Sequence, residues 1–345
     1  MRVVVTDPPA FTPWYDHELA CALARAGADV TVSTSRFRFG ALPAPEGYRR
    51  TERFYPLSSR LFRRSPLRIP LKVAEHAFVA ASLAATHPDV LHVQWLALPQ
   101  VDMHLRYRAP TVFTAHDLLP RRTAGKRKLW QTALQRFDRV VVHTERGREV
   151  MGELGVEARV IPHPVYPSSA IRADDGATVL ALGVIRPYKG IADSVEVVRR
   201  LPGARLLVAG DPAMPIDELR AAPRTEWRLG YLSAAELDRA LSDTTVALFP
   251  YRPEIDQSGA LLQALGAGVP AVVYDVAGLA DPIRAFGAGR VVPAGDVDAL
   301  TAAVGELLGD PVALAGARAG AERARAALTW DAAAAAHLAL YEELL

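Results

Sequence analysis

The amino-acid sequence predicts an α/β fold with two parallel sheets, each covered by helices. Short runs of β-branched residues alternate with helical patterns along the whole chain. These runs are hydrophobic almost throughout, which is typical of strands buried on both faces of a parallel sheet. A segment rich in Pro, Ser, Asp and Gly at 163–177 interrupts the alternation and is the best candidate for a linker. We therefore predict two doubly wound domains of similar size.

In the first domain, expected at 1–165, helical patterns such as YDHELACALARAG (15–27) separate the strands. The strand-like runs are RVVVTD (2–7), DVTVST (29–34), DVLHVQW (89–95), PTVFTAH (110–116), RVVVHT (139–144) and RVIPHP (159–164). The linker is expected at 166–176, where Pro, Ser, Asp and Gly replace the apolar residues.

The second domain, expected at 177–328, repeats this alternation, with AAELDRALSD (234–243) as one of its amphipathic helices. Its strand-like runs are TVLALGV (178–184), ARLLVAG (204–210), VALFPY (246–251), PAVVYDV (270–276) and RVVPAG (290–295). The last helical stretch, 329–345, follows the completed second sheet and is therefore free to pack elsewhere.

The composition of the chain indicates its size class, its redox compartment and its relation to membranes. The chain has 345 residues, of which 50% are hydrophobic, so burial of a core is not limiting. The single cysteine, Cys21, excludes an internal disulfide and fits a reducing compartment. The first residues lack the pattern of a signal peptide, and no apolar run is long enough to span a bilayer. We therefore expect a cytoplasmic protein.

Positive charge is concentrated in two clusters, although the net charge is only +2. Residues 49–72 carry seven Arg and one Lys against a single acid, Glu52, and 121–128 form a second basic cluster. The clusters are either solvated loops and helix faces, or sites that contact an anionic membrane surface or a phosphorylated acceptor. Nucleic-acid binding is disfavoured because no recognition motif accompanies the charge.

Two apparent motifs have simpler explanations. Residues 266–271 fit the dinucleotide pattern G-x-G-x-x-A, but a helix precedes them and a strand follows, the reverse of what that pattern needs. Asp296-Val297-Asp298 matches an acid-x-acid metal site, yet it opens an amphipathic helix, where Asp is favoured as a cap. No other cluster has metal-ligand spacing, so we expect no metal.

The segment ALGVIRPYKGI (181–191) predicts an anion site. A buried strand ends at Gly183, Arg186 and Lys189 follow in the loop, and Gly190 opens the next helix. Ligands of open α/β sheets bind at the carboxyl edge of the strands, and a helix start favours anions. The alternative is a helix-start loop with ordinary surface cations.

A second helix start supports the same site. Ser258 and Gly259 begin a helix after the strand VALFPY, and small residues there let backbone N–H groups approach phosphate oxygens. Two helix starts and two cations at one sheet edge indicate a diphosphate ligand.

Six segments together carry a resemblance to a known family. They are VIPHPVY (160–166), TVFTAHD (111–117), GVIRPYKGI (183–191), GYLSAAELDRALSDTTVALFPY (230–251), DQSGALLQALGAGVPAVVYDVAGLADPI (256–283) and GAGRVVPAGDVDAL (287–300). With them the sequence resembles the retaining glycosyltransferases of family 4 over nearly its whole length. The resemblance implies the GT-B fold, in which two Rossmann-like domains with parallel sheets face each other across a cleft. It further implies that the first domain holds the acceptor, the second holds the nucleotide-sugar, and a terminal helix (329–345) crosses back to the first.

The resemblance also assigns site residues. It implies that Arg186 and Lys189 grip the donor diphosphate after Gly183, and that Ser258 and Gly259 offer backbone N–H groups to it. The turn at Tyr231-Leu232 would border the base. His116, at the end of the strand TVFTAH, matches a family histidine near the transferred sugar, although a lone histidine at a strand end is more often structural.

Three departures from the family pattern stand out. The usual Gly-Arg is Gly183-Val184 here, so one cation is missing, and Arg186 is the candidate substitute. The usual glycine-rich first loop is DPPAFTPWYDHE, whose Phe11, Trp14 and Tyr15 either stack on an acceptor or pack in the core.

The third departure concerns the two family glutamates, which fall on Ile255 and Gln263. A related subset has DQSG in place of the first glutamate. Asp256 and Gln257 are then the candidate partners of donor-sugar hydroxyls, and Gln263 is a candidate partner of a ribose hydroxyl.

The resemblance implies a hexosyltransferase that moves a sugar from a UDP- or GDP-sugar to an acceptor with retention, without cofactor or metal. The acceptor would be a glycan, a lipid-linked molecule or a small molecule, and the basic 49–72 segment would allow peripheral contact with the inner membrane face. Two alternatives remain: a GT-B sugar-nucleotide epimerase or phosphorylase, and a catalytically silent nucleotide- or glycan-binding protein, which the missing glutamates suggest. The identities of base, sugar and acceptor and the oligomeric state are left open.

Overall fold

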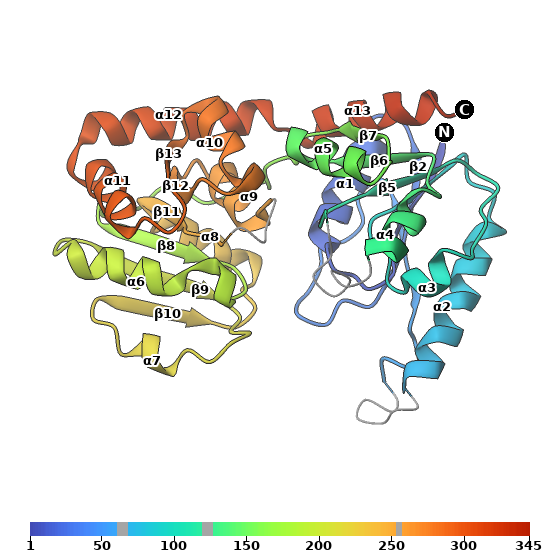
Figure 1. Ribbon diagram of the computed structural model, residues 1–345, viewed down its shortest axis with the longest axis horizontal. Helices are drawn as coiled ribbons and strands as arrows, with labels where there is room; N and C mark the ends of the chain where they lie inside the picture. Colours follow the sequence, from blue (N-terminus) through green and yellow to red (C-terminus); the bar gives the residue numbers. More distant parts are fainter. Residues whose placement is uncertain (61–67, 119–126, 253–256) are drawn as a thin grey trace. The chain divides into compact units, whose positions relative to one another are not determined.

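The computed structural model describes residues 1–60, 68–118, 127–252 and 257–345 (Figure 1). The chain forms two compact units. Unit 1 comprises Met1–His163 together with Trp330–Leu345, and unit 2 comprises Pro164–Thr329.

Unit 1 is built on a seven-stranded parallel sheet with the order β3-β2-β1-β4-β5-β6-β7. Its strands are β1 (Arg2–Asp7), β2 (Asp29–Ser35), β3 (Arg49–Phe54), β4 (Val90–Val93), β5 (Thr111–Thr114), β6 (Arg139–Val142) and β7 (Ala158–Val160). The hydrophobic pattern did not predict β3, because this edge strand reads RRTERF and exposes charged side chains.

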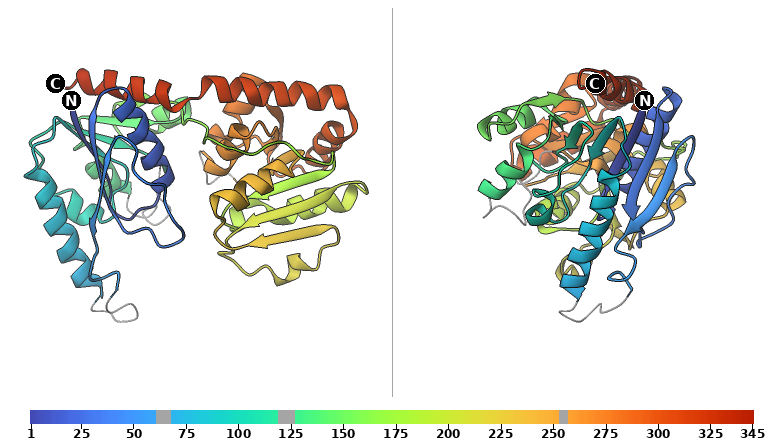
Figure 2. Two further views of the ribbon diagram at one scale, coloured as in Figure 1. Left: turned by 180° about the vertical axis from the view of Figure 1, so that it is seen from behind. Right: turned by 90° about the vertical axis from the view of Figure 1, so that its right-hand side faces the viewer.

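The helices of unit 1 cover two chemically different faces of this sheet. They are α1 (Pro13–Arg25), α2 (Arg68–Ala84), α3 (Pro99–Asp102), α4 (Arg127–Leu134), α5 (Glu145–Glu153) and α13 (Trp330–Glu342). One face is apolar, and residues such as Leu91 and Phe113 pack there against α2, α4 and α5. The other face lies under α1 and α13, which contact each other (Figure 2).

Unit 2 repeats the plan with a six-stranded parallel sheet of order β10-β9-β8-β11-β12-β13. Its strands are β8 (Thr178–Leu182), β9 (Arg205–Gly210), β10 (Thr225–Leu229), β11 (Val246–Phe249), β12 (Ala271–Tyr274) and β13 (Gly289–Val292). The charged edge strand β10, TEWRL, also escaped the hydrophobic pattern.

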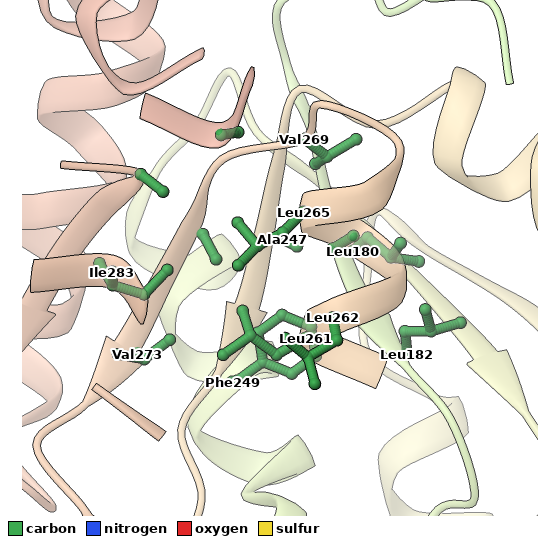
Figure 3. Packing of buried hydrophobic residues seen from close by; sticks show 14 of the residues in the cluster. Leu180, Leu182, Ala247, Phe249, Leu261, Leu262, Leu265, Val269, Val273 and Ile283 are labelled. Carbon is green, nitrogen blue, oxygen red and sulfur yellow. The ribbon is translucent and has the colours of Figure 1, made fainter. Parts of the chain in front are cut away.

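Apolar helices cover both faces of the second sheet. The helices are α6 (Ile191–Arg200), α7 (Asp217–Arg220), α8 (Ala234–Ser242), α9 (Gly259–Gly266), α10 (Asp281–Phe286), α11 (Val297–Gly309) and α12 (Pro311–Ala327), with 3₁₀ turns η2 (Pro187–Lys189) and η3 (Ala277–Leu279). Figure 3 shows Leu261 and Leu262 of α9 packed on Phe249 of β11. This packing fixes the start of α9 relative to the sheet.

The strand orders confirm the predicted α/β class with two Rossmann-like sheets. In both sheets the order reverses between two neighbouring strands, β1 and β4 in unit 1 and β8 and β11 in unit 2. Ligands of such sheets bind outside the carboxyl ends of the strands at this reversal. The fold therefore directs attention to the residues that follow these four strands.

The segment expected to be a linker is part of unit 2. Ser168 and Ser169 donate hydrogen bonds to the Asp238 carboxylate, and the Ala173 N–H donates to the Ser242 carbonyl at 3.0 Å. The polar residues that suggested a linker are thus bonded to α8. The chain passes between the units at His163/Pro164 and at Thr329/Trp330.

Among the described residues, no single helix has both the length and the apolar character needed to cross a bilayer. The segments Val297–Gly309 and Pro311–Glu342 meet that test only as a pair, with a bend of 98° between them.

Candidate functional site

Lys189 lies at the carboxyl edge of β8, where its side chain points inward. The loop after β8 folds back through η2, so the side chain is only 8% exposed. Its Nζ donates hydrogen bonds to the Leu182 carbonyl at 3.0 Å and to the Tyr251 hydroxyl at 2.7 Å. Burial lowers the pKa of this amine to about 8. The group therefore remains largely a fixed cation at neutral pH.

Two glycines create the space for this cation. Gly183 has φ +97°, and a Cβ at this position would lie 2.7 Å from Lys189 Nζ and 3.4 Å from Cβ of Ala260. The ammonium group and the first turn of α9 therefore meet beside Gly183. Gly190 has φ +64°, and a Cβ there would lie 2.1 Å from the Pro250 carbonyl oxygen. Only glycine fits this close crossing.

The start of α9 faces the same corner. Ser258 is the N-cap, and its Oγ accepts a hydrogen bond from the Leu261 N–H at 3.3 Å. The first main-chain bond of the helix runs from the Leu262 N–H to the Ser258 carbonyl, so the N–H groups of Gly259 and Ala260 have no intrahelical acceptor. We define Lys189, Gly183, Ser258 and Gly259 as the anion corner. A buried ammonium group and a helix start are both suited to an anion.

Arg186 differs from Lys189 in its surroundings. Its side chain is exposed, and no residue within the described part of the chain accepts a hydrogen bond from its guanidinium group. The loop thus presents one buried, fixed cation and one exposed cation.

The remaining residues predicted to bind the donor lie before α8 and before or within α9 of unit 2. Tyr231 is 40% exposed and Leu232 is half-buried, just before α8 begins in a capping box of Ser233 and Glu236. Gln257 and Gln263 are half-buried, before and within α9. Asp256 lies outside the described residues, as does Ile255.

His116 follows β5 at the carboxyl edge of the sheet of unit 1. Its Nε2 lies 2.8 Å from Oε1 of Gln94 and donates to this amide oxygen. Its ring stacks on Trp95, with centroids 5.4 Å apart, and meets the Tyr15 ring edge-on at 4.7 Å. Burial, and then the neighbouring imidazoles of His143 and His163, lower the pKa of His116 well below its usual value. It is therefore a neutral, oriented imidazole, and no group within the described ranges of the chain donates to its Nδ1.

His116 belongs to a layer of buried polar residues under α1 and α13. His92 lies 2.6 Å from the Tyr341 hydroxyl and 2.7 Å from Thr114 Oγ1, and His143 Nδ1 donates to the Ile161 carbonyl at 2.9 Å. Burial lowers the pKa of His92 well below its usual value and that of His143 to about 4. Within the described part of the chain, no group of three or more His, Cys, Asp or Glu side chains is placed to hold a metal ion.

The three aromatic residues predicted on the acceptor side differ in exposure and packing. Tyr15 is 1% exposed and packs against His116 and Trp330, so it belongs to the core and not to an open stacking surface. Trp14 is half-buried. Phe11 is 58% exposed, and its ring meets Trp95 edge-on with centroids 5.3 Å apart.

A pair of buried acids holds the loop that carries Phe11. Asp7 ends β1 and accepts a hydrogen bond from the Thr12 N–H at 3.0 Å. Burial raises the pKa of Asp7 to about 6 and that of its neighbour Asp16 well above its usual value, with the two acids hydrogen-bonded to each other. The Thr12 hydroxyl in turn accepts from the indole N–H of Trp95 at 2.8 Å. The first loop and Trp95 are thus fixed as one piece.

Sequence reasoning missed Tyr251, Gln94, Trp95 and Asp7. Each follows or ends one of the strands at which the strand order reverses. Their position at these strand ends could have identified them. Recognising that position requires the strand order, which cannot be read from a single sequence.

Comparison with known families gives matches in both units. Residues 15–169 match the model described as Glycosyltransferase Family 4, and residues 176–310 match the model described as Glycosyl transferases group 1. A D-inositol 3-phosphate glycosyltransferase of Mycobacterium marinum is 29% identical over 322 residues, covering 78% of this chain and 68% of that protein. A glycogen synthase of Mycobacterium tuberculosis is 28% identical over 375 residues, covering 94% of this chain and 89% of that protein.

Solved structures share the architecture. Sucrose-phosphate synthase from Thermosynechococcus elongatus has a TM-score of 0.80 at 20% identity and covers 100% of this chain and 99% of its own. Anabaena HepE, solved in complex with UDP and glucose, has a TM-score of 0.73 at 14% identity, with 100% of both chains covered.

Proposed function

We propose that the chain, whose two units each match a glycosyltransferase family model, transfers a hexose from a UDP- or GDP-sugar to an acceptor hydroxyl with retention of anomeric configuration. The observation that carries this proposal is the anion corner of unit 2. There a buried Lys189 ammonium lies beside Gly183, next to the start of α9. A nucleoside diphosphate supplies the negative charge that such a corner is suited to bind.

The proposed chemistry uses this charge in the transition state. The bond between the anomeric carbon and the diphosphate oxygen breaks, the acceptor oxygen bonds to the same carbon, and the acceptor proton moves to the departing phosphate. Negative charge grows on the diphosphate as this happens. Lys189 and the N–H groups of Gly259 and Ala260 stabilise that charge without reorganising, which lowers the barrier, and the exposed Arg186 adds a second positive charge.

We propose that these groups carry the charge stabilisation that a divalent metal supplies in other transferases, so that transfer requires neither metal nor cofactor. The turn at Tyr231-Leu232 would then border the base, and Gln263 would contact the ribose. Gln257, with Asp256 outside the described residues, would contact the donor sugar.

On the acceptor side, we propose that neutral His116 accepts a hydrogen bond at Nδ1 from a hydroxyl of the transferred sugar or of the acceptor. The Gln94 amide fixes the opposite nitrogen as the donor at 2.8 Å, which supports this assignment. Phe11 and Trp95 then offer aromatic surface to the acceptor, a glycan, a lipid-linked molecule or a small molecule. The protein would act in glycan or glycoconjugate biosynthesis.

We also propose that the enzyme is cytoplasmic and contacts the inner membrane face through unit 1. Helix α2 exposes apolar residues spaced by four and three positions, Ala74, Phe78 and Ala81, and Phe78 is 77% exposed. Arg68 and Lys72 lie at the start of the same helix. Apolar and basic residues together favour an anionic bilayer surface. Co-sedimentation with anionic vesicles should be lost in Phe78→Ser, and equal sedimentation of the variant would contradict the contact.

The test of the proposed transfer reaction uses the full chain and a panel of UDP-, GDP- and TDP-sugars. We expect slow release of nucleotide from at least one donor, unchanged by EDTA and lost in Lys189→Ala. Binding of a donor without release or transfer would instead favour the silent binding protein. Conversion of the donor sugar without an acceptor would favour the epimerase; the family matches favour neither alternative.

A further inference from the structure

Tyr251 connects the two parts of the anion corner. It lies at the carboxyl end of β11 and is 2% exposed. Its hydroxyl accepts a hydrogen bond from Lys189 Nζ at 2.7 Å and lies 3.2 Å from Ser258 Oγ. The cation and the helix cap are therefore joined by one phenolic oxygen.

The donor and acceptor capacities of these groups fix the direction of the chain. An ammonium group has no acceptor, so Lys189 must donate to Tyr251. The buried Tyr251 proton then needs an acceptor, and within the described part of the chain the Ser258 oxygen is the one in reach. Ser258 Oγ also accepts from the Leu261 N–H. With both of its acceptor positions in use, the Ser258 hydroxyl keeps its own proton to donate elsewhere.

We propose that Tyr251 is a positioning residue that holds Lys189 in place and turns the Ser258 hydroxyl into a hydrogen-bond donor to the donor diphosphate. This inference rests on the proposed function, and it adds two roles to it: one for a tyrosine outside the anion corner, and one for the side chain of Ser258 beyond capping α9. The donor proton of Ser258 and the ammonium of Lys189 are then oriented before the ligand arrives. Preorganisation of this kind is what makes such donors effective.

The structure explains why a phenylalanine would not replace Tyr251. The ring packs in the apolar core with Phe249, with centroids 5.7 Å apart, and phenylalanine would keep this contact. Only the hydroxyl would be lost. Of its two acceptors among the described residues, Lys189 would then retain only the Leu182 carbonyl, and the Ser258 hydroxyl would be free to rotate.

The test compares Tyr251→Phe with the wild type in the full chain. Titrations with UDP, GDP, ADP and TDP identify the diphosphate that binds, and the matching nucleoside without phosphates serves as the second probe. We expect the affinity of Tyr251→Phe for the diphosphate to fall on the order of 10-fold or more, the scale of a hydrogen bond to a charged group. Its affinity for the nucleoside should not change. Equal losses for both probes would show a structural effect and overturn the inference.

Tyr48→Phe is the matched control in unit 1. It also removes a buried tyrosine hydroxyl, which lies 3.0 Å from His17 Nδ1. We expect a loss of stability without any change in diphosphate affinity.

Two further readouts separate positioning from packing. In wild type the diphosphate affinity should fall above the Lys189 pKa of about 8. Tyr251→Phe removes an acceptor that favours the charged amine, so this fall should begin at lower pH. In a Ser258→Gly background, where glycine preserves capping, the effect of Tyr251→Phe should shrink. The proposed role would be contradicted if the pH dependence of diphosphate affinity were the same in Tyr251→Phe as in wild type and if the losses of affinity from Tyr251→Phe and Ser258→Gly were fully additive.

These outcomes also separate the inference from the proposed function. If the wild type binds a diphosphate and Tyr251→Phe binds it equally well, the role of Tyr251 is refuted and the transferase assignment stands. If the wild type binds none of the four diphosphates, the proposed function fails, and this inference fails with it.

Discussion

The carboxyl edges of the two sheets have the same topology and opposite chemistry. In unit 2 the edge gathers a buried cation, glycines and the start of α9. In unit 1 it gathers uncharged imidazoles, an amide and aromatic rings. All nine histidines of the chain lie in unit 1. One edge is therefore suited to an anion and the other to a neutral ligand rich in hydroxyl groups.

The difference shows that the parallel sheet supplies a position, whereas the residues that follow each strand supply the chemistry. In unit 2, burial leaves Lys189 a cation with a lowered pKa of about 8. In unit 1, the same physical cost keeps His116 and His143 neutral. The proposed transfer uses both environments, because its leaving group is anionic and the acceptor hydroxyl that attacks is neutral.

Removal of the buried cation should have the largest effect. Lys189→Ala should lower the rate of transfer by about 10² to 10³, the scale for losing one preorganised charge-stabilising group. Arg186→Ala should lose on the order of 10²-fold by the same mechanism. Steady-state kinetics with the active donor measure both. Arg199→Ala removes an exposed cation at the far end of α6, paired with Glu196, and should be nearly neutral. Full activity in Lys189→Ala would remove the anion corner from the mechanism.

His116→Ala tests the neutral edge. It should lower kcat on the order of 10- to 100-fold, the scale of one hydrogen bond that strengthens in the transition state. The affinity for the nucleoside diphosphate should hardly change, because the cations that bind it belong to unit 2. Turnover and nucleotide titration on one preparation separate the two effects. An equal loss in nucleotide binding would indicate a structural role for His116.

Features that depend on neighbouring residues in the chain could be predicted from the sequence. Features that depend on the order of strands in the sheets could not. The buried strands, Lys189, Ser258 and His116 all lie in local patterns of apolar runs and helix starts. The edge strands β3 and β10 were missed because charged side chains hide their pattern. Tyr251 and Trp95 were missed because their partners, Lys189 and His116, are far away in sequence. The burial of Tyr15 and of Lys189 follows from packing that spacing alone does not encode.

Acid should destabilise unit 1 selectively. Burial lowers the pKa of His92 and His116 well below the usual value and that of His143 and His337 to about 4. Below about pH 6.5 the unfolded chain binds protons that these folded imidazoles do not, so stability is lost as pH falls, by up to about 1.4 kcal/mol per pH unit for each group.

The raised pKa values of Asp7 and Asp16 act in the opposite direction, because the folded acids hold protons that the unfolded chain has lost. Because four imidazoles outweigh two acids, we expect a net loss of about 2–3 kcal/mol per pH unit between pH 6 and pH 5. Hydrogen exchange read by mass spectrometry should show protection falling in unit 1 before unit 2. Equal loss of protection in both units would contradict the contrast between the two edges.

The smallest expected effect concerns the exposed ring at the neutral edge. Phe11 is 58% exposed on a loop held by Asp7, so Phe11→Ala should leave the unfolding free energy nearly unchanged. Loss of its aromatic surface should raise the KM for the acceptor only several-fold, since one such contact contributes about 1 kcal/mol. The KM for the donor should stay constant. Ile171→Ala, which truncates a side chain that is 84% exposed in unit 2, should change neither constant. A rise in the donor KM with Phe11→Ala would place this ring at the anionic ligand and remove it from the neutral edge.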